Sequence, residues 1–186
     1  MTIEEVKEEL KAVRSYFYRY PNDLQAYMHW TGGHYGQGSG DYHYCIDADG
    51  TINNTSPLTE IPDATWCRNT GSIAIALECC YGAKAYRDPF SADLGEEPPT
   101  DAQVEAMAQL IAAISDIFDV PIDNYHFMTH AEAADNLDGR NVCPPYGPDN
   151  GCDRWDLAVL KESDTWMEGG DILRGKAIWY QQQEAV

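Results

Sequence analysis

Two histidines stand at the predicted ends of apolar strands. The sequence contains five histidines: His29, His34, His43, His126 and His130. His29 lies near the end of the apolar run 24–30, and His130 lies at the end of the run 124–130. Because ligands of α/β proteins gather where strands end and loops begin, we expect His29 and His130 to face a common site.

A cysteine offers a third ligand of matching chemistry. Cys152 follows a loop, residues 133–152, that is rich in Gly and Pro. Two imidazoles and one thiolate form a catalytic zinc set that leaves a fourth position for water. The three residues are far apart in sequence, however, and no short ligand spacing of the kind typical of zinc motifs indicates a metal site. A metal-free α/β protein with structural histidines therefore stays open on this pattern alone.

The first half of the chain predicts one helix and a set of strands. Apolar residues at three- and four-residue spacing predict a helix over residues 3–18. A strand over 24–30 follows, then a Gly-rich loop over 31–41. The Asp49-Gly50 pair between apolar runs predicts a β-hairpin.

The second half predicts a buried strand and the clearest helix. Residues 72–80 alternate Ile or Leu with Ala, so we expect a buried strand with a helix packed over its alanines. An acidic loop is expected over 82–99. Thr100 and Gln103 have capping-box spacing and open a long amphipathic helix. A short helix is expected over 155–161.

Interleaved helices and strands predict an α/β fold, in one domain with a central mixed β-sheet flanked by helices. The length of 186 residues suits a single core. We expect an N-terminal helical segment over 1–23, a catalytic domain over 24–161, and a C-terminal tail over 162–186 that packs on the domain or frays.

Composition and charge exclude several partners. The net charge is −19, with 31 acidic and 12 basic residues, so we expect no nucleic-acid partner. No apolar run approaches the ~18 residues of a membrane span, so no membrane insertion is expected. The first ten residues lack the basic and apolar parts of a secretory signal, which predicts synthesis in the cytoplasm without a signal peptide. We expect the cysteines to remain reduced and the protein to be a monomer.

Six pieces of sequence, from His29 to Leu157, resemble the N-acetylmuramoyl-L-alanine amidase type 2 family, in family order and over about two-thirds of the chain. This family includes phage amidase endolysins and the peptidoglycan recognition proteins. The pieces are His29-Trp30-Thr31, Tyr42-His43-Tyr44 with Asp49-Gly50-Thr51-Ile52, Ser72-Ile73-Ala74-Ile75, Thr100 with Gln103, His130-Ala131-Glu132, and Cys152-Asp153-Arg154-Trp155-Asp156-Leu157.

The resemblance implies the family fold and a single catalytic zinc ion (Zn²⁺) held by His29, His130 and Cys152. It also places Tyr42 beside the metal, where a phenol could orient water or stabilise an oxyanion. Aspartate takes the third position in other members, so Asp149 and Asp153 remain alternatives to Cys152.

The sequence also departs from the family pattern. Many relatives carry a lysine where this chain has Asn150, and Arg140 or Arg154 are nearby cations that could replace it. Residues expected to touch the ligands or the substrate are Glu132, Asp156, Arg154, Asn150 and His34.

The resemblance implies hydrolysis of the amide bond between N-acetylmuramic acid and L-alanine, with peptidoglycan or a muropeptide as substrate. A phage endolysin that acts on the host cell wall is the favoured setting. A muropeptide-recycling enzyme and a secreted toxin are alternatives with the same chemistry. A peptidoglycan-binding module without catalysis is a further alternative, although such modules typically lose the cysteine that this chain keeps.

Overall fold

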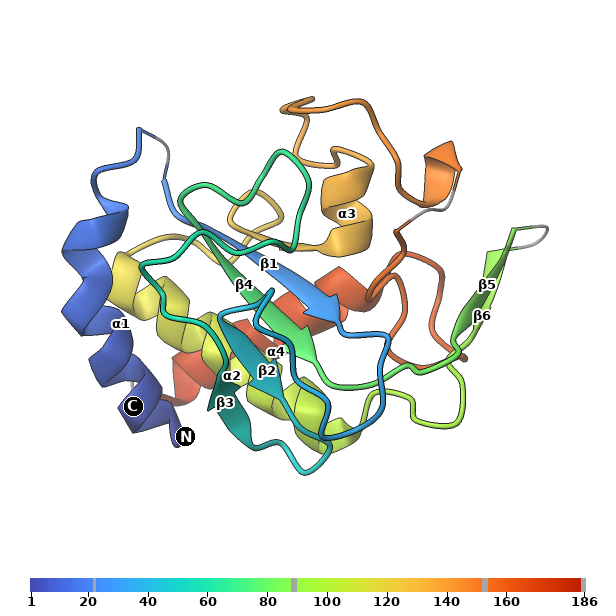
Figure 1. The fold of residues 1–186 in the computed structure, drawn as a ribbon, viewed down its shortest axis with the longest axis horizontal. Coiled ribbons are helices and arrows are strands. Elements are labelled where there is room, and N and C mark those ends of the chain that lie inside the picture. Colours follow the sequence, from blue (N-terminus) through green and yellow to red (C-terminus); the bar gives the residue numbers. More distant parts are fainter. Residues whose placement is uncertain (22, 88–89, 152–153, 185–186) are drawn as a thin grey trace.

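A five-stranded mixed sheet forms the centre of the computed structural model, which describes residues 1–21, 23–87, 90–151 and 154–184 (Figure 1). The helices are α1 (Ile3–Phe17), α2 (Asp101–Phe118), α3 (His130–Ala134), the 3-10 helix η1 (Pro148–Asn150) and α4 (Gly169–Glu184). The strands are β1 (Gln25–Trp30), β2 (Tyr44–Ile46), β3 (Ile52–Asn54), β4 (Ser72–Leu77), β5 (Lys84–Arg87), β6 (Phe90–Asp93) and β7 (Phe127–Thr129).

The sheet has the order β3-β2-β4-β1-β7. Strands β2, β4, β1 and β7 are mutually parallel, and only β3 runs antiparallel, to β2. The antiparallel pair is the hairpin predicted at Asp49-Gly50, and Gly50 has the positive φ of 87° that such a turn demands. The predicted mixed sheet flanked by helices is thus confirmed.

Helices α2 and α4 cover one face of the sheet, and α3 and long loops lie on the other (Figure 1). The core joins the apolar side of α2 to Ile73, Ile75 and Leu77 of β4. The helix therefore covers the isoleucine side of β4, and the prediction that it would cover the alanines was wrong. Burying the larger aliphatic side chains removes more apolar surface from water, which favours the observed side.

The N-terminus of α2 is fixed by the predicted capping box. The Thr100 hydroxyl accepts from the Gln103 backbone N–H at 3.0 Å, and the Gln103 side chain accepts from Thr100 N at 3.0 Å. The Gln103 amide also donates to the carbonyls of Ile46 and Glu78, at the ends of β2 and β4, at 2.9 and 3.0 Å. This fully buried side chain thus joins the helix start to the sheet end.

Three predicted elements differ in the structure. The loop predicted over 82–99 contains the two-stranded hairpin β5-β6. Residues 155–161 form turns and not a helix. His130 begins α3 and does not close a strand, because Thr129 adopts extended backbone and caps a new helix there. No helix in the described part of the chain is long and apolar enough to cross a membrane.

Candidate metal centre

Two parallel strands bring the two predicted ligands together. Strands β1 and β7 are neighbours, with Met28 opposite Thr129, so the next residues, His29 and His130, emerge side by side. Their Nδ1 atoms are 3.0 Å apart, and their side chains are buried. The pairing of these two strands brings together two histidines that are 101 residues apart in the sequence.

A carboxylate faces both imidazoles. The Oδ2 atom of Asp156 lies 3.5 Å from Nδ1 of His29 and 3.3 Å from Nδ1 of His130. The ligand atoms of the three residues lie within 4.8 Å of one another, and all three residues are buried. Two imidazole nitrogens and a carboxylate oxygen that converge in this way are a donor set that suits zinc.

The protonation states fit a ligand role. Burial, followed by the nearby His130, lowers the pKa of His29 to about 4, so its imidazole is neutral and has a lone pair at pH 7. Burial alone would raise the pKa of Asp156, but the charge and hydrogen bond of His130, with those of His29, outweigh it and hold the pKa well below its ordinary value. Asp156 is therefore an anion that faces the neutral imidazole of His29.

Hydroxyl groups hold the far side of each ring. The Thr65 hydroxyl lies 3.0 Å from Nε2 of His29, and the Tyr146 hydroxyl lies 3.3 Å from Nε2 of His130. A partner at Nε2 fixes the tautomer and orientation of an imidazole, and leaves Nδ1 as the atom presented to the centre. Neither residue was predicted from the sequence, because a Thr or Tyr in a polar loop carries no signal of its own.

Tyr42 lies against the His29 ring, with the ring centroids 5.1 Å apart. Its hydroxyl is 3.5 Å from the Trp30 carbonyl oxygen. Burial, assisted by the negative charge of Asp156, raises the pKa of Tyr42 well above its ordinary value. The phenol therefore keeps its proton at neutral pH and is available as a hydrogen-bond donor.

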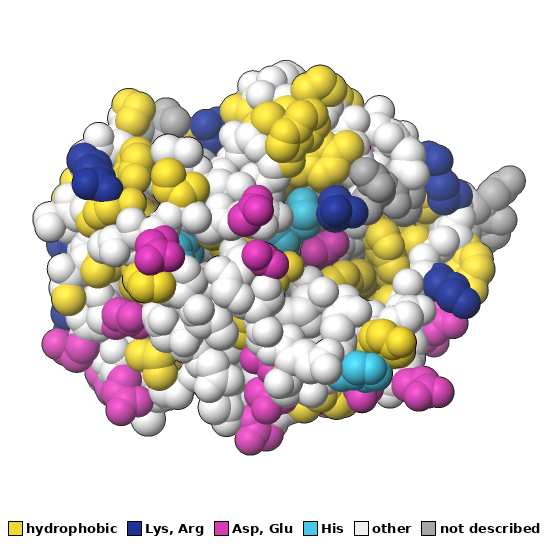
Figure 2. All heavy atoms as spheres, in the orientation of Figure 1, with side chains coloured by type: hydrophobic (Ala, Val, Ile, Leu, Met, Phe, Trp, Pro, Cys, Tyr) yellow, Lys and Arg dark blue, Asp and Glu magenta, His cyan; other side chains and the backbone are white. Residues whose placement is uncertain are grey.

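His130 and Asp156 line the floor of a groove. Two adjoining hollows, of about 390 and about 370 Å³, share Asp63, Ala64, His130 and Arg154. One hollow continues to Trp66 and Tyr146, and the other continues to Tyr42 and Trp155. Figure 2 shows histidine, basic and acidic side chains gathered in a depression near the middle of this face. The groove is thus open on both sides of His130.

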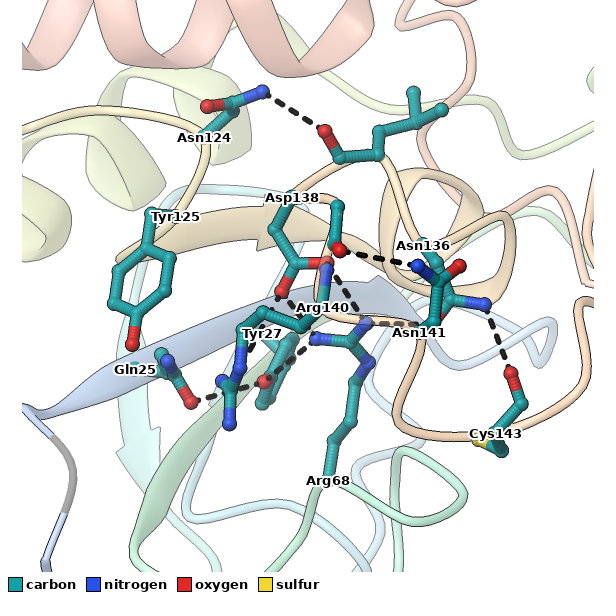
Figure 3. A network of polar contacts seen from close by, with 12 residues as sticks. Gln25, Tyr27, Arg68, Asn124, Tyr125, Asn136, Asp138, Arg140, Asn141 and Cys143 are labelled. Atoms are coloured by element: carbon teal, nitrogen blue, oxygen red, sulfur yellow. Dashed lines mark hydrogen bonds and ion pairs between the residues drawn. The ribbon is translucent and has the colours of Figure 1, made fainter.

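A buried arginine joins the two loops that flank one side of the groove (Figure 3). Arg68 donates to both carboxylate oxygens of Asp138, at 2.7 and 3.0 Å, and to Asn136 Oδ1 at 2.9 Å. The Arg68 and Asp138 side chains are 1% and 0% exposed. Asn136 in turn donates to the Cys143 carbonyl at 2.9 Å, so the ion pair fixes the loop that leads to Tyr146.

The remaining predicted residues lie in different places. Arg154 lines both hollows. Asn150 donates to Asp135 at 3.2 Å, and His34 stacks on Tyr81 and lies 3.2 Å from Glu97. Asp149 donates its backbone N–H to Asp135 at 2.9 Å.

Arg140 packs over the Tyr125 ring and does not line either hollow, so of the two arginines considered for the missing lysine only Arg154 borders the groove. Glu132 points into an ion pair with Arg174. Cys152 and Asp153 lie outside the described residues.

Fold and site together define an α/β protein with a buried His-His-carboxylate centre beneath an open groove. The family model for N-acetylmuramoyl-L-alanine amidase matches residues 15–146, which is more than half of the chain. The chain therefore belongs to the N-acetylmuramoyl-L-alanine amidase family. Its general activity is the hydrolysis of an amide bond in peptidoglycan.

Among solved structures, the chain is similar to the endolysin amidase LysCS from Clostridium intestinale. The two are 16% identical, with a TM-score of 0.45, over 62% of this chain and 73% of that one. It is also similar to the Ph2119 endolysin of a Thermus scotoductus bacteriophage, with 18% identity and a TM-score of 0.44, over 65% of this chain and 84% of that one. A search of curated proteins found no match.

Proposed function

We propose that this protein is a zinc-dependent amidase that hydrolyses the bond between N-acetylmuramic acid and L-alanine in polymeric peptidoglycan. The observation that carries the proposal is the convergence of two buried imidazole Nδ1 atoms, 3.0 Å apart, on one carboxylate at the floor of an open groove. When bound, zinc supplies Lewis-acid chemistry, which polarises an amide carbonyl and makes water more acidic.

His29 and His130 are the two proposed histidine ligands, and Cys152 is the proposed third, as the resemblance to phage amidases implies. A catalytic zinc site keeps one position open for water, so two histidines leave room for one further protein ligand. With Cys152 in that position, Asp156 lies beside the centre as an anion. The competing assignment gives the third position to Asp156, whose distances to both rings support it.

Tyr42 and Arg154 are the proposed partners of the substrate. Tyr42 keeps its proton at neutral pH and borders the same hollow as His130, so its phenol can donate to the oxyanion that develops when the amide is attacked. Arg154 supplies a positive charge at the same place, where many relatives use a lysine. Thr65 and Tyr146 hold the histidine rings so that neither nitrogen donor has to reorganise.

An endolysin is the setting that we propose. The groove continues on both sides of His130, which suits a cross-linked polymer better than a short soluble muropeptide. A recycling enzyme would prefer the short substrate. A secreted toxin would share the preference for polymer, and the source of the chain would separate it from an endolysin.

The activity test uses intact sacculi and a soluble muramyl peptide in parallel, with and without a chelator, and identifies products by mass spectrometry. We expect peptides that begin with a free L-alanine amine, faster release from sacculi, loss of release on chelation and recovery with zinc. Intact substrate with zinc still bound would favour a binding module. Intact substrate and no bound metal would contradict the ligand assignment.

The third ligand is tested by cobalt substitution. A thiolate bound to Co²⁺ gives an intense near-ultraviolet charge-transfer band, whereas a carboxylate does not. We expect the band in the wild-type protein and in Asp156→Asn, and its loss in Cys152→Ser. A wild-type protein that binds Co²⁺ without this band would assign the third position to Asp156.

A further inference from the structure

A buried ion pair lies directly behind the helix that carries His130. Arg174 of α4 is 7% exposed. Its Nη1 donates to Glu132 Oε2 at 2.8 Å and its Nη2 donates to Glu132 Oε1 at 2.7 Å. This two-point contact fixes the plane of the carboxylate as well as its position.

Glu132 is also the residue that caps α3. Its Oε2 accepts from the Thr129 backbone N–H at 2.9 Å, while its own N–H donates to the Thr129 hydroxyl at 3.2 Å. His130 is the first residue of α3 and lies between these two partners. With only five residues, α3 is too short to be stable by itself, so its cap and its tertiary contacts decide where its backbone lies.

The same guanidinium holds the strand before the helix. Nη1 of Arg174 donates to the Phe127 carbonyl of β7 at 2.9 Å, and β7 is an edge strand of the sheet. Arg174 therefore binds residues on both sides of His130, at 127 and at 132. The approach of α4 is so close that a Cβ on Gly170 would come within 2.4 Å of Glu132 Oε1.

Helix α4 lies outside the range that the family model matches, residues 15–146. From these contacts we propose that Arg174 is a positioning residue for the metal centre: through Glu132 and Phe127 it fixes the turn from β7 to α3, and with it the His130 imidazole. Its role for the metal rests on the proposed zinc site.

The test measures zinc affinity and stability separately. Metal-free variants are titrated against a chromogenic chelator at a temperature where circular dichroism shows each of them to be folded. We expect Arg174→Met to weaken zinc binding about tenfold, the lower end of what residues behind a ligand contribute. The matched control is Asp171→Asn, because Asp171 binds the same guanidinium at 2.6 Å but is 78% exposed. The control should bind zinc as the wild type does.

A double variant distinguishes a positioning role of Arg174 from a role in fold stability alone. Arg174→Met leaves the Glu132 carboxylate buried without its cation, which destabilises the fold, whereas Glu132→Met with Arg174→Met removes both charges and should recover the melting temperature. In the double variant the Phe127 carbonyl still lacks the Arg174 donor and the Thr129 N–H also loses its Glu132 acceptor, so zinc affinity should stay about tenfold low. Affinity that returns together with the melting temperature would overturn the proposal, as would wild-type affinity in folded Arg174→Met.

Two further measurements keep the outcome decisive. If Arg174→Met does not fold, Arg174→Lys and the double variant carry the same comparison. Hydrogen exchange of the Thr129 amide in metal-free protein should accelerate in Arg174→Met but not in Asp171→Asn, and equal exchange would overturn the proposal without reference to zinc. A wild-type protein that binds no zinc would reveal failure of the metal centre itself before any variant is compared.

Discussion

The substitution Asp138→Asn tests whether the buried ion pair of Arg68 stabilises the fold. Asp138 accepts two hydrogen bonds from Arg68, whose side chain is 1% exposed and also donates to Asn136 and Tyr27. An amide oxygen can replace one of the two bonds but not the charge. Breaking a buried pair from one side costs about 3–5 kcal/mol, and we expect about 3 because one bond is kept.

A loss of about 3 kcal/mol corresponds to a fall of about 6–12 °C in melting temperature for a domain of this size. Urea denaturation at pH 7 measures the free energy directly. The control is Glu8→Gln, which removes an exposed pair with Lys11, 72% and 54% exposed, and should cost less than about 0.5 kcal/mol. A loss below about 1 kcal/mol for Asp138→Asn would refute the reasoning.

The same pair predicts a pH dependence. Burial alone would raise the pKa of Asp138, but the hydrogen bonds and charge of Arg68 outweigh burial and hold that pKa below its ordinary value. A carboxyl with a lowered pKa in the folded protein contributes stability above its unfolded value of about 4. The difference between wild type and Asp138→Asn should therefore be constant from pH 5 to 8 and shrink as the pH falls below about 4.

Three other substitutions have expected outcomes. Thr100→Ala removes the cap of α2 and should cost about 1 kcal/mol in urea denaturation, and an unchanged midpoint would speak against the capping box. Gln103→Leu leaves the Glu78 carbonyl without its donor, while the Ile46 carbonyl keeps the Glu78 backbone N–H. It should lower the unfolding free energy by about 2 kcal/mol, and a smaller effect than that of Thr100→Ala would contradict this. Trp66, 57% exposed at the groove, should contribute by stacking on substrate, so Trp66→Ala should lower kcat/KM about tenfold at unchanged melting temperature, and equal kcat/KM would exclude the contact.

The sequence predicted those helices and strands whose formation depends on local residue spacing. The helix at 3–18, the strand at 24–30 and the hairpin at Asp49-Gly50 follow from local spacing and turn chemistry, and the structure confirms them as α1, β1 and β2-β3. The cap of α2 was predictable for the same reason, since Thr100 and Gln103 are only three residues apart.

Tertiary contacts decided the rest. The hairpin β5-β6 was missed because an acidic, Pro-containing stretch carries little strand signal, and its two strands pair mainly with one another. The start of α3 was missed because the apolar run through residue 129 conceals the threonine cap that begins the helix. The arrangement of His29 beside His130 followed from the strand-end rule, whereas Thr65 and Tyr146 come from loops whose courses no spacing in the sequence predicts.

The separation of 101 residues between His29 and His130 has a consequence for how the protein matures. Contacts so distant in sequence form late in folding, because the chain loses much entropy before they contribute any stability. The pair of imidazoles comes together only when β7 has joined β1. A chain still emerging from the ribosome has one histidine in place and nothing beside it, so the proposed metal site would form in one step with completion of the sheet.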